Sequence, residues 1–175
     1  MKETLDVGSG TQKMSADCVG IDRSPASAAD IVWDLDQFPW PIEDNRFGCI
    51  HASHVIEHLQ DVGRAMAESH RVAQDGADVF VVTPHYSSHN SFTDPTHRHH
   101  LAARSFHYFT GEDFATFSSY AHSFKLVKVE LTFGGNVVLD NLGRFLAGRS
   151  LPWCERHAAW VFPALDIRCH LRARK

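Results

Sequence analysis

The sequence predicts an α/β fold built on a mostly parallel β-sheet, and three stretches lead to this prediction. Residues 5–7 run directly into a turn at Gly8 and Gly10, as the first strand of a doubly wound sheet does. Residues 79–82, Val-Phe-Val-Val, form the unbroken apolar run that a buried parallel strand requires. Residues 126–131 alternate apolar and charged side chains, which favours an antiparallel or edge strand.

The first half of the chain contains four expected strands and one unusually short connection. The strands span about residues 4–7, 17–22, 31–33 and 47–52. Only residues 11–16 separate the glycine turn from the second strand, whereas a parallel crossover normally needs about a dozen residues. The first crossover helix must therefore be abbreviated or missing, which leaves one side of a ligand pocket thinly covered.

A helix, a turn and a long loop are expected after the fourth strand. Asp61 should cap a helix that runs to about Ala73, and Asp75-Gly76 then turns the chain into the fifth strand. Residues 85–104 are polar, histidine-rich and predicted to be irregular. Loops of this length inside a compact domain are usually functional or disordered.

The last third of the chain should add helices and close the sheet with a hairpin. Thr110 and Asp113 are spaced much like a capping box, so a helix should begin there and carry Phe114 and Phe117 inward. Two further helices are expected over about residues 136–148 and 152–161, and Trp153 and Trp160 should lie in the core or an interface. A last strand at about 167–172 pairs antiparallel with the sixth, which completes a seven-stranded sheet.

Length and composition limit the class of protein. The 175 residues fit one domain, and a net charge of −4 argues against a nucleic-acid-binding surface. The four cysteines lie far apart without paired spacing, which indicates reduced thiols in a cytoplasmic protein. We expect no signal peptide, because the N-terminus enters a strand at once, and no transmembrane segment, because no apolar run approaches about 18 residues.

The glycine turn narrows the class of ligand. A dinucleotide-binding turn would carry a third glycine at position 13, where this chain has Lys13. The next acid that ends a strand is Asp22, and a carboxylate there can accept hydrogen bonds from both hydroxyls of a ribose. The turn is too short for a pyrophosphate, so the pattern indicates a nucleoside without a diphosphate.

Six segments in order resemble the class I S-adenosylmethionine-dependent methyltransferases, and in particular a bacterial subgroup of the type 11 methyltransferases. Residues 5–10 are similar to the first motif of that family, 19–22 to the second, and 34–35 to its adenine-contacting acid. Residues 54–59 resemble the segment after the fourth strand in the type 11 methyltransferases. The segments that resemble the bacterial subgroup are 84–88 and 94–97, with Ser105, Phe106, Phe109 and 162–164 behind them. The resemblance implies a Rossmann-like fold in one domain, residues 1–175. Its cofactor-binding half would be about 1–84, and its substrate-side loops and helices about 85–163.

The resemblance also implies roles for the residues at the rim of the sheet. Its cofactor contacts fall on Asp6, Gly8, Gly10, Asp22, Asp34, Leu35, Ser53 and His54. Asp6 would orient the glycine turn or reach the methionine amine, Asp22 would take the ribose hydroxyls, and Asp34 would accept from the adenine amino group. The Leu35 N–H would face a ring nitrogen, and Asp36 is an equally acidic rival of Asp34.

Three polar side chains follow the fourth strand, at His54, Glu57 and His58. In a helix these positions share one face, so a metal site is one alternative. We expect instead that His54 lines the pocket and that His58 packs under the rim of the sheet, capping backbone carbonyls.

The densest polar cluster is Asp94-Pro-Thr-His97-Arg-His99-His100, with His85 shortly before it. We expect a hydrogen-bonded acceptor pocket here, with Asp94 in the network and a neutral imidazole of His85 or His97 taking a proton from the substrate. A metal held by Asp94, His97 and His99 is the alternative. In the similar subgroup an arginine tends to stand where this chain has His99, and an aromatic residue where it has His100.

The leading hypothesis is therefore an S-adenosylmethionine-dependent methyltransferase that leaves S-adenosylhomocysteine as product. Its acceptor would be an oxygen or nitrogen of a polar small molecule or glycan-type substrate, and the chain could work as a homodimer. Two alternatives stay open. One is a non-catalytic cofactor-binding subunit of a complex, and the other is a metal-dependent enzyme that uses residues 85–100.

Overall fold

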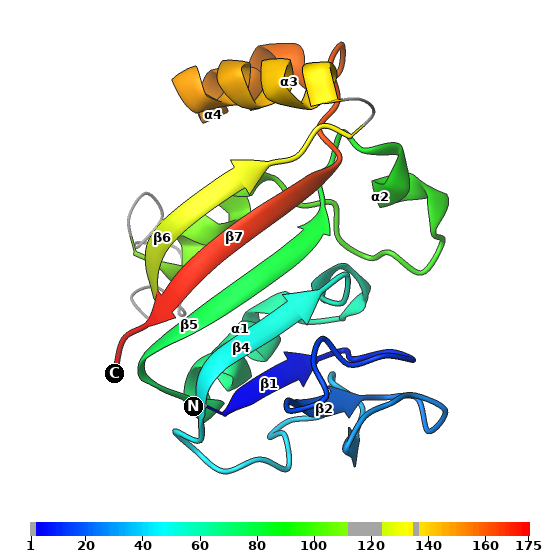
Figure 1. Ribbon diagram of the computed structural model, residues 1–175, viewed down its shortest axis with the longest axis vertical. Helices are drawn as coiled ribbons and strands as arrows, with labels where there is room; N and C mark the ends of the chain where they lie inside the picture. Colours follow the sequence, from blue (N-terminus) through cyan, green and yellow to red (C-terminus); the bar gives the residue numbers. More distant parts are fainter. Residues whose placement is uncertain (1–2, 112–123, 135–136) are drawn as a thin grey trace.

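A computed structural model describes residues 3–111, 124–134 and 137–175, and it contains a seven-stranded sheet of order β3-β2-β1-β4-β5-β7-β6 (Figure 1). The strands are β1 Thr4–Val7, β2 Val19–Asp22, β3 Ile31–Val32, β4 Phe47–Ser53, β5 Ala73–Pro84, β6 Phe124–Leu131 and β7 Asp166–Ala173. The pairs from β3 to β5 are parallel, and β7 runs antiparallel to both β5 and β6. The predicted mostly parallel sheet with a C-terminal antiparallel hairpin is confirmed.

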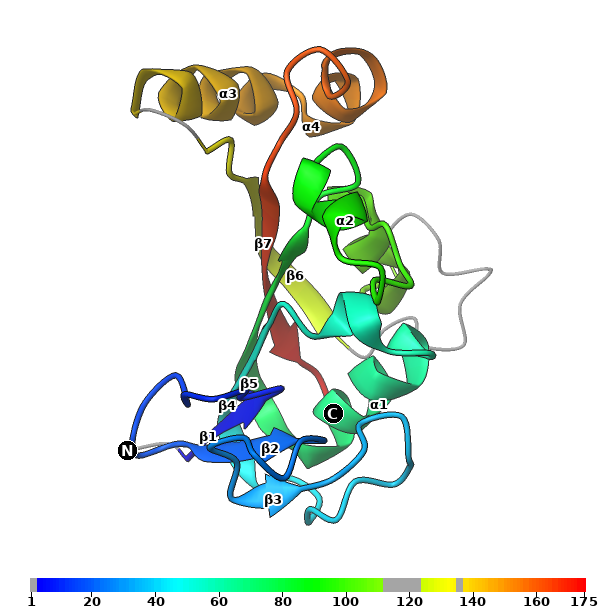
Figure 2. The same ribbon diagram turned by 90° about the vertical axis from the view of Figure 1, so that its right-hand side faces the viewer.

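The helices of the described segments lie mainly on one side of the sheet and at one end of it. They are η1 Ile56–His58, α1 Val62–Val72, α2 His89–Thr93, η2 Ala103–Phe109, α3 Val137–Arg149, α4 Leu151–Trp153 and η3 Cys154–Ala158. The Asp61 carboxylate accepts from the Arg64 N–H and caps α1, as predicted. In Figure 2, α1 and α2 stand on the same side of the sheet, and α3 and α4 lie beyond its end.

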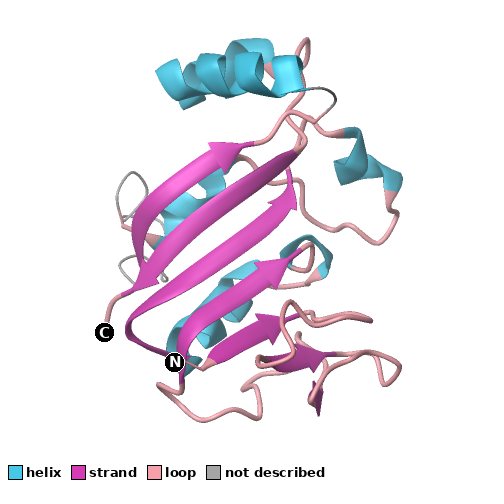
Figure 3. Cartoon of the chain, in the orientation of Figure 1, coloured by secondary structure: helices cyan, strands magenta, loops and turns pink. Residues whose placement is uncertain are grey.

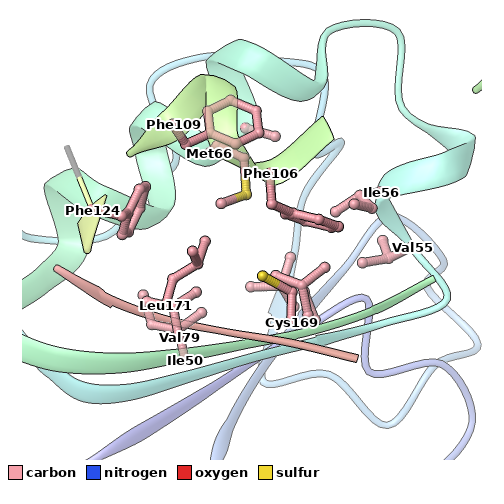
Figure 4. Close-up of a cluster of buried hydrophobic side chains, with 14 of the residues drawn as sticks. Ile50, Val55, Ile56, Met66, Val79, Phe106, Phe109, Phe124, Cys169 and Leu171 are labelled. Atoms are coloured by element: carbon pink, nitrogen blue, oxygen red, sulfur yellow. The ribbon is translucent and has the colours of Figure 1, made fainter. Parts of the chain in front are cut away.

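The main core fills the space between the sheet and the helices α1 and η2 (Figure 4). From the helices come Met66, Phe106 and Phe109, and each is less than 9% exposed. They pack toward the strand residues Ile50, Val79, Cys169 and Leu171, which are buried to the same degree. Burying one such large apolar side chain is worth about 1.5–3 kcal/mol, so this layer holds the two helices on the sheet.

The opposite face of the sheet is open, and this corrects one prediction. The run over residues 79–82 was expected to be buried on both faces, but Phe80 is 37% exposed and Val82 is half-buried. The connection between β1 and β2 is a loop without a helix (Figure 3), so the crossover is abbreviated as predicted, and no described helix covers these side chains. We call this surface the open face; it is lined by His51, Ser53, Phe80, Val82, Lys128, Glu130, Arg168 and His170.

Other differences from the prediction concern boundaries and the histidine-rich segment. The segment 85–104 is not wholly irregular, because α2 and the start of η2 lie within it. β5 begins directly after α1, and Gly76, at φ 70°, lies where the pairing of β4 with β5 shifts register. The helix expected to carry Phe114 and Phe117 falls outside the described residues. Trp153 is 54% exposed and Trp160 71%, which excludes the core for both.

An arginine on α1 fixes the helix-free connection between β3 and β4. Arg71 donates to both carboxylate oxygens of Glu68, at 2.9 and 2.8 Å, and to the backbone carbonyls of Trp40 and Ile42 at 3.0 and 2.8 Å. Glu68 in turn accepts from the Trp40 N–H at 2.7 Å. The planar guanidinium therefore satisfies several groups of the loop at once, which a lysine could not do.

Replacing Arg71 by methionine should lower the free energy of unfolding by about 2 kcal/mol, because the Glu68 carboxylate and two carbonyls lose a charged donor. The matched control is Arg46→Met, since Arg46 pairs with Glu3 at the surface, with side-chain exposures of 36% and 42%. That variant should lose less than about 1 kcal/mol. Urea denaturation compares the two, and equal losses would contradict a special role for Arg71.

Candidate active site

A cleft of about 250 Å³ lies where the parallel strands β1, β2 and β4 end. Crevices at the carboxyl ends of parallel strands are the usual ligand sites of such sheets, and this volume is at the lower end for small-molecule sites. We call it the cleft; it is lined by Gly8, Gly10, Asp22, Arg23, Asp34, Leu35, Asp36, His54, Val55, His58, Leu59 and Thr96. Six of the eight predicted cofactor contacts are therefore brought together here.

The glycine turn shapes the floor of the cleft. Gly8 and Gly10 have φ angles of 70° and 55°, which L side chains rarely adopt. A Cβ on Gly8 would come within 2.5 Å of Val55 Cγ2, whereas a Cβ on Gly10 would meet nothing within 4 Å. Gly8 is thus required by packing against Val55, and Gly10 leaves open space where a ligand can approach the backbone.

Two acids hold this turn in place. Asp22 Oδ2 accepts from the Gly10 N–H at 2.9 Å, and its Oδ1 accepts from the Ser24 N–H at 2.8 Å. Each carboxylate oxygen keeps a second lone pair, so Asp22 can still accept from a ligand hydroxyl. Asp6 is buried, does not line the cleft, and accepts from the Met14 N–H at 2.7 Å. Asp6 thus fixes the loop that follows the glycine turn, and its expected contact with the methionine amine stays a prediction.

Both acids after β3 line the cleft, but they differ in how far the protein occupies their carboxylates. Asp36 Oδ1 accepts from the backbone N–H of Gln60 at 2.8 Å and so ties the loop to the segment before α1. Within the described segments, the Asp34 carboxylate accepts only from the nearby Asp36 N–H, at 3.1 Å. Asp34 therefore keeps more free acceptor capacity in the cleft, beside the buried Leu35.

His54 enters the cleft through an unusual backbone conformation. Its φ is 53°, a left-handed value that is uncommon outside glycine, and its N–H donates to the Val82 carbonyl at 2.8 Å. His54 Nδ1 lies 3.4 Å from Glu57 Oε1, and the Glu57 carboxylate raises the pKa of His54. Ser53, predicted for the same rim, lies instead on the open face.

A second, more open hollow of about 620 Å³ adjoins the cleft and shares His54 and His58 with it. We call it the outer hollow; it is lined by His54, Glu57, His58, Pro84, Asn90, Thr93, Asp94, Pro95 and His97. Two of the three predicted catalytic residues, Asp94 and His97, are therefore here. Hydrogen bonds from the Thr96 N–H and hydroxyl lower the pKa of Asp94, which keeps it ionised.

The other predicted base, His85, lies elsewhere. Its side chain is fully buried, with Nδ1 2.8 Å from Ser87 Oγ and Nε2 3.1 Å from Glu155 Oε1. Glu155 also accepts from the Ala103 N–H at 2.6 Å. These contacts join the end of β5 to η3, and His85 lines neither the cleft nor the outer hollow.

The histidine-rich segment is held largely by its own side chains. His99 Nε2 lies 2.9 Å from the Leu59 carbonyl, and His100 Nδ1 lies 2.8 Å from Ser91 Oγ. The structure does not bring His99 together with Asp94 and His97 as a ligand set. In the described segments, the group of side chains that could hold an ion is Glu57, His58 and His97.

Several cleft residues were not predicted as contacts. They are Arg23, Val55, Leu59 and Thr96, together with His58, which was expected beneath the rim. Arg23 follows Asp22 directly, so its place at the end of a strand was a usable signal. Thr96 belongs to the segment 94–97, but nothing in its residue type indicates contact with a cleft built by residues 8–59.

Comparisons with known proteins decide the family. Residues 2–129 match the family described as "Methyltransferase domain". The chain belongs to this methyltransferase family. It is an enzyme of the S-adenosylmethionine-dependent methyltransferase class. No curated protein matches the sequence of this methyltransferase.

Solved structures of methyltransferases share the fold at low sequence identity. One is a SAM-dependent methyltransferase from Archaeoglobus fulgidus, with a TM-score of 0.65, 15% identity, and coverage of 98% of this chain and 86% of that one. Another is from Mesorhizobium loti, with a TM-score of 0.62, 12% identity, and coverage of 98% and 90%. A third is a chain from the complex between the Haloferax volcanii Trm112 methyltransferase activator and a putative methyltransferase. Its TM-score is 0.61 at 12% identity, and the match covers 99% of this chain and 83% of that one.

Two further findings concern membrane-spanning helices and disulfide bonds in this methyltransferase. Among the described residues, no helix combines the length and the apolar character needed to cross a bilayer. The four cysteines form no disulfide.

Alanine substitutions at Gly8 and Gly10 should separate the cost of a steric clash from the cost of backbone strain. Gly10→Ala should cost roughly 1–2 kcal/mol of unfolding free energy, the price of a left-handed residue with a Cβ. Gly8→Ala should cost clearly more, because its Cβ also collides with Val55. Thermal and urea denaturation of both variants give the comparison. If Gly10→Ala proves the more damaging, the described packing of the turn is wrong.

Proposed function

We propose that the cleft binds S-adenosylmethionine, with the nucleoside lying across the ends of β1, β2 and β3. The open space at Gly10 admits the ligand, the spare lone pairs of Asp22 accept from the ribose hydroxyls, and Asp34 accepts from the adenine amino group. The observation that carries this proposal is the convergence of these acids on one cleft beside a glycine turn. The fit is good because Asp22 and Asp34 keep acceptor capacity that no described protein group takes up.

We further propose that the acceptor binds in the outer hollow, because it adjoins the cleft and shares His54 and His58 with it. When bound, S-adenosylmethionine would supply a sulfonium methyl; a lone pair of the acceptor bonds to the methyl carbon while the C–S bond breaks, and S-adenosylhomocysteine leaves. Holding acceptor and methyl in line supplies much of the rate enhancement. The imidazoles, carboxylates and amide around the outer hollow suit an oxygen or nitrogen of a polar small molecule or glycan-type acceptor.

His97 is the base that we propose for acceptors that must lose a proton. His97 Nδ1 lies 3.2 Å from the Ser91 carbonyl, which can only accept, so Nδ1 carries the hydrogen. Nε2 then keeps a lone pair that can take a proton from a hydroxyl. Asp94 acts through its neighbours, because its carboxylate holds Thr96 and its lowered pKa makes it a weak base.

A second candidate is that the chain works with a protein partner. The open face and the exposed apolar side chains beyond the sheet support this view. The latter are Val137, Val138, Leu142, Phe145, Trp153, Trp160 and Val161. We propose that two copies of the chain form a homodimer through this apolar surface. We also propose that the protein acts in the cytoplasm, since its cysteines form no disulfide. One fold neighbour comes from a complex with a methyltransferase activator, which supports an enzyme that depends on a partner protein as the alternative to the homodimer.

Calorimetric titration with S-adenosylmethionine and S-adenosylhomocysteine tests the cofactor site. Asp22→Asn and Asp34→Ala should each weaken binding at least ten-fold, because each removes an acceptor for the nucleoside. Asp17→Ala is the control, since Asp17 is exposed and does not line the cleft. Unchanged affinity in both cleft variants would refute the proposed orientation of the nucleoside.

His97→Ala should reduce turnover at least a hundred-fold with little change in cofactor affinity, because His97 lines the outer hollow and not the cleft. The measurement is methyl release over a panel of polar hydroxyl and amine acceptors, together with cofactor titration. The exposed His89 serves as the control histidine. Equal losses of turnover and cofactor affinity in His97→Ala would place this residue in the cofactor site instead.

A further inference from the structure

Three side chains between the cleft and the outer hollow form a ligand set that neither predicted metal site contained. Glu57, His58 and His97 each offer one ligand atom, and these atoms lie within 4.8 Å of one another. The rings of His58 and His97 meet edge to face, with centroids 4.6 Å apart. Two imidazoles and a carboxylate are the protein ligands of many catalytic zinc sites, which leave further positions for water or substrate.

The carboxylate of this set is buried and incompletely satisfied. Glu57 is 1% exposed, and its Oε2 accepts from the Thr83 hydroxyl at 3.0 Å. Its Oε1 has no hydrogen-bond partner, although His54 Nδ1 lies 3.4 Å away. A buried carboxylate oxygen without a hydrogen bond is costly, and a bound cation would remove that cost.

Both imidazoles are oriented as metal-ligating histidines usually are. His97 Nδ1 donates to the Ser91 carbonyl, which leaves its Nε2 free. The Thr96 hydroxyl donates to Asp94 Oδ1 at 2.7 Å, so its oxygen accepts from His58 Nδ1 at 2.9 Å. His58 therefore also keeps a free Nε2, held by a chain of hydrogen bonds that ends on a carboxylate.

The two histidines come from segments that several hydrogen bonds join, two of them to one backbone carbonyl. The backbone carbonyl of Glu57 accepts from the N–H groups of Arg98 and His99, at 2.8 and 3.2 Å. These bonds fix the segment of His97 against η1, which carries Glu57 and His58. The ligand set is therefore built by the fold, and does not depend on long side chains that reach across a surface.

We propose that Glu57, His58 and His97 bind one divalent ion of the zinc class. Tetrahedral zinc with bonds of about 2.0–2.1 Å holds its ligand atoms roughly 3.3 Å apart, so the three side chains close in on binding. Glu57, His58 and His97 all line the outer hollow, which is open, so a further ligand could reach the ion from there. Resting on the proposed function, the ion would contact an acceptor hydroxyl there and lower its pKa, so that the hydroxyl proton leaves to solvent in the open hollow. His97 Nε2 would then be a ligand and no longer the base.

The test is zinc and cobalt binding to the chain without a histidine tag and without cofactor. One zinc per chain should bind with micromolar or tighter affinity in a chelator competition, and cobalt should give the visible absorption of a tetrahedral site. Glu57→Gln and His97→Gln should each weaken binding at least ten-fold. His89→Ala and His99→Gln are matched controls that should leave affinity unchanged, and circular dichroism checks that every variant is folded.

Several results would overturn the proposal. These are no saturable binding, several weak equivalent ions spread over the thirteen histidines, or affinity that survives in both ligand variants. Titration of S-adenosylmethionine into the same samples keeps the two proposals apart. Cofactor binding without zinc binding refutes the metal site alone, and zinc binding without cofactor binding refutes the proposed function alone.

Discussion

The hydrogen bond from the Gly10 N–H to Asp22 Oδ2 is the interaction on which the site depends. It joins the turn after β1 to the end of β2, across a connection that contains no helix. In a longer crossover, a packed helix would hold that turn. Here the carboxylate does so, and the second acid, Asp6, fixes the next part of the loop through Met14. The geometry of the cleft thus follows from two acids and two glycines.

The two faces of the sheet differ in how the described helices cover them. The sheet packs its apolar side chains toward α1 and η2 (Figure 4). No described helix covers the open face, which is lined mostly by polar residues. The histidine-rich segment then closes the cleft from the side of β5, tied to η1 through the Glu57 carbonyl. Cleft and outer hollow meet at His54 and His58, so a nucleoside and an acceptor can lie next to each other.

Local patterns in the sequence predicted much of this fold, and long-range packing limited the rest. Local sequence patterns were enough to predict most of the strands, the α1 cap at Asp61 and the short crossover. The exposure of Phe80 could not be predicted from residues 79–82, because it depends on whether a helix from another part of the chain covers that face of the sheet. The contact of His85 with Glu155 joins residues 70 apart, and the pairing of His58 with His97 crosses 39 residues. The histidine pattern therefore did not distinguish buried, structural imidazoles from those that line the cleft or the outer hollow.

The most direct measurement is a crystal structure of the chain with S-adenosylhomocysteine. The account predicts electron density for the nucleoside across the ends of β1, β2 and β3, with the ribose hydroxyls on Asp22 and the purine between Asp34 and Leu35. An empty cleft at saturating ligand, or a nucleoside bound on the open face, would contradict it.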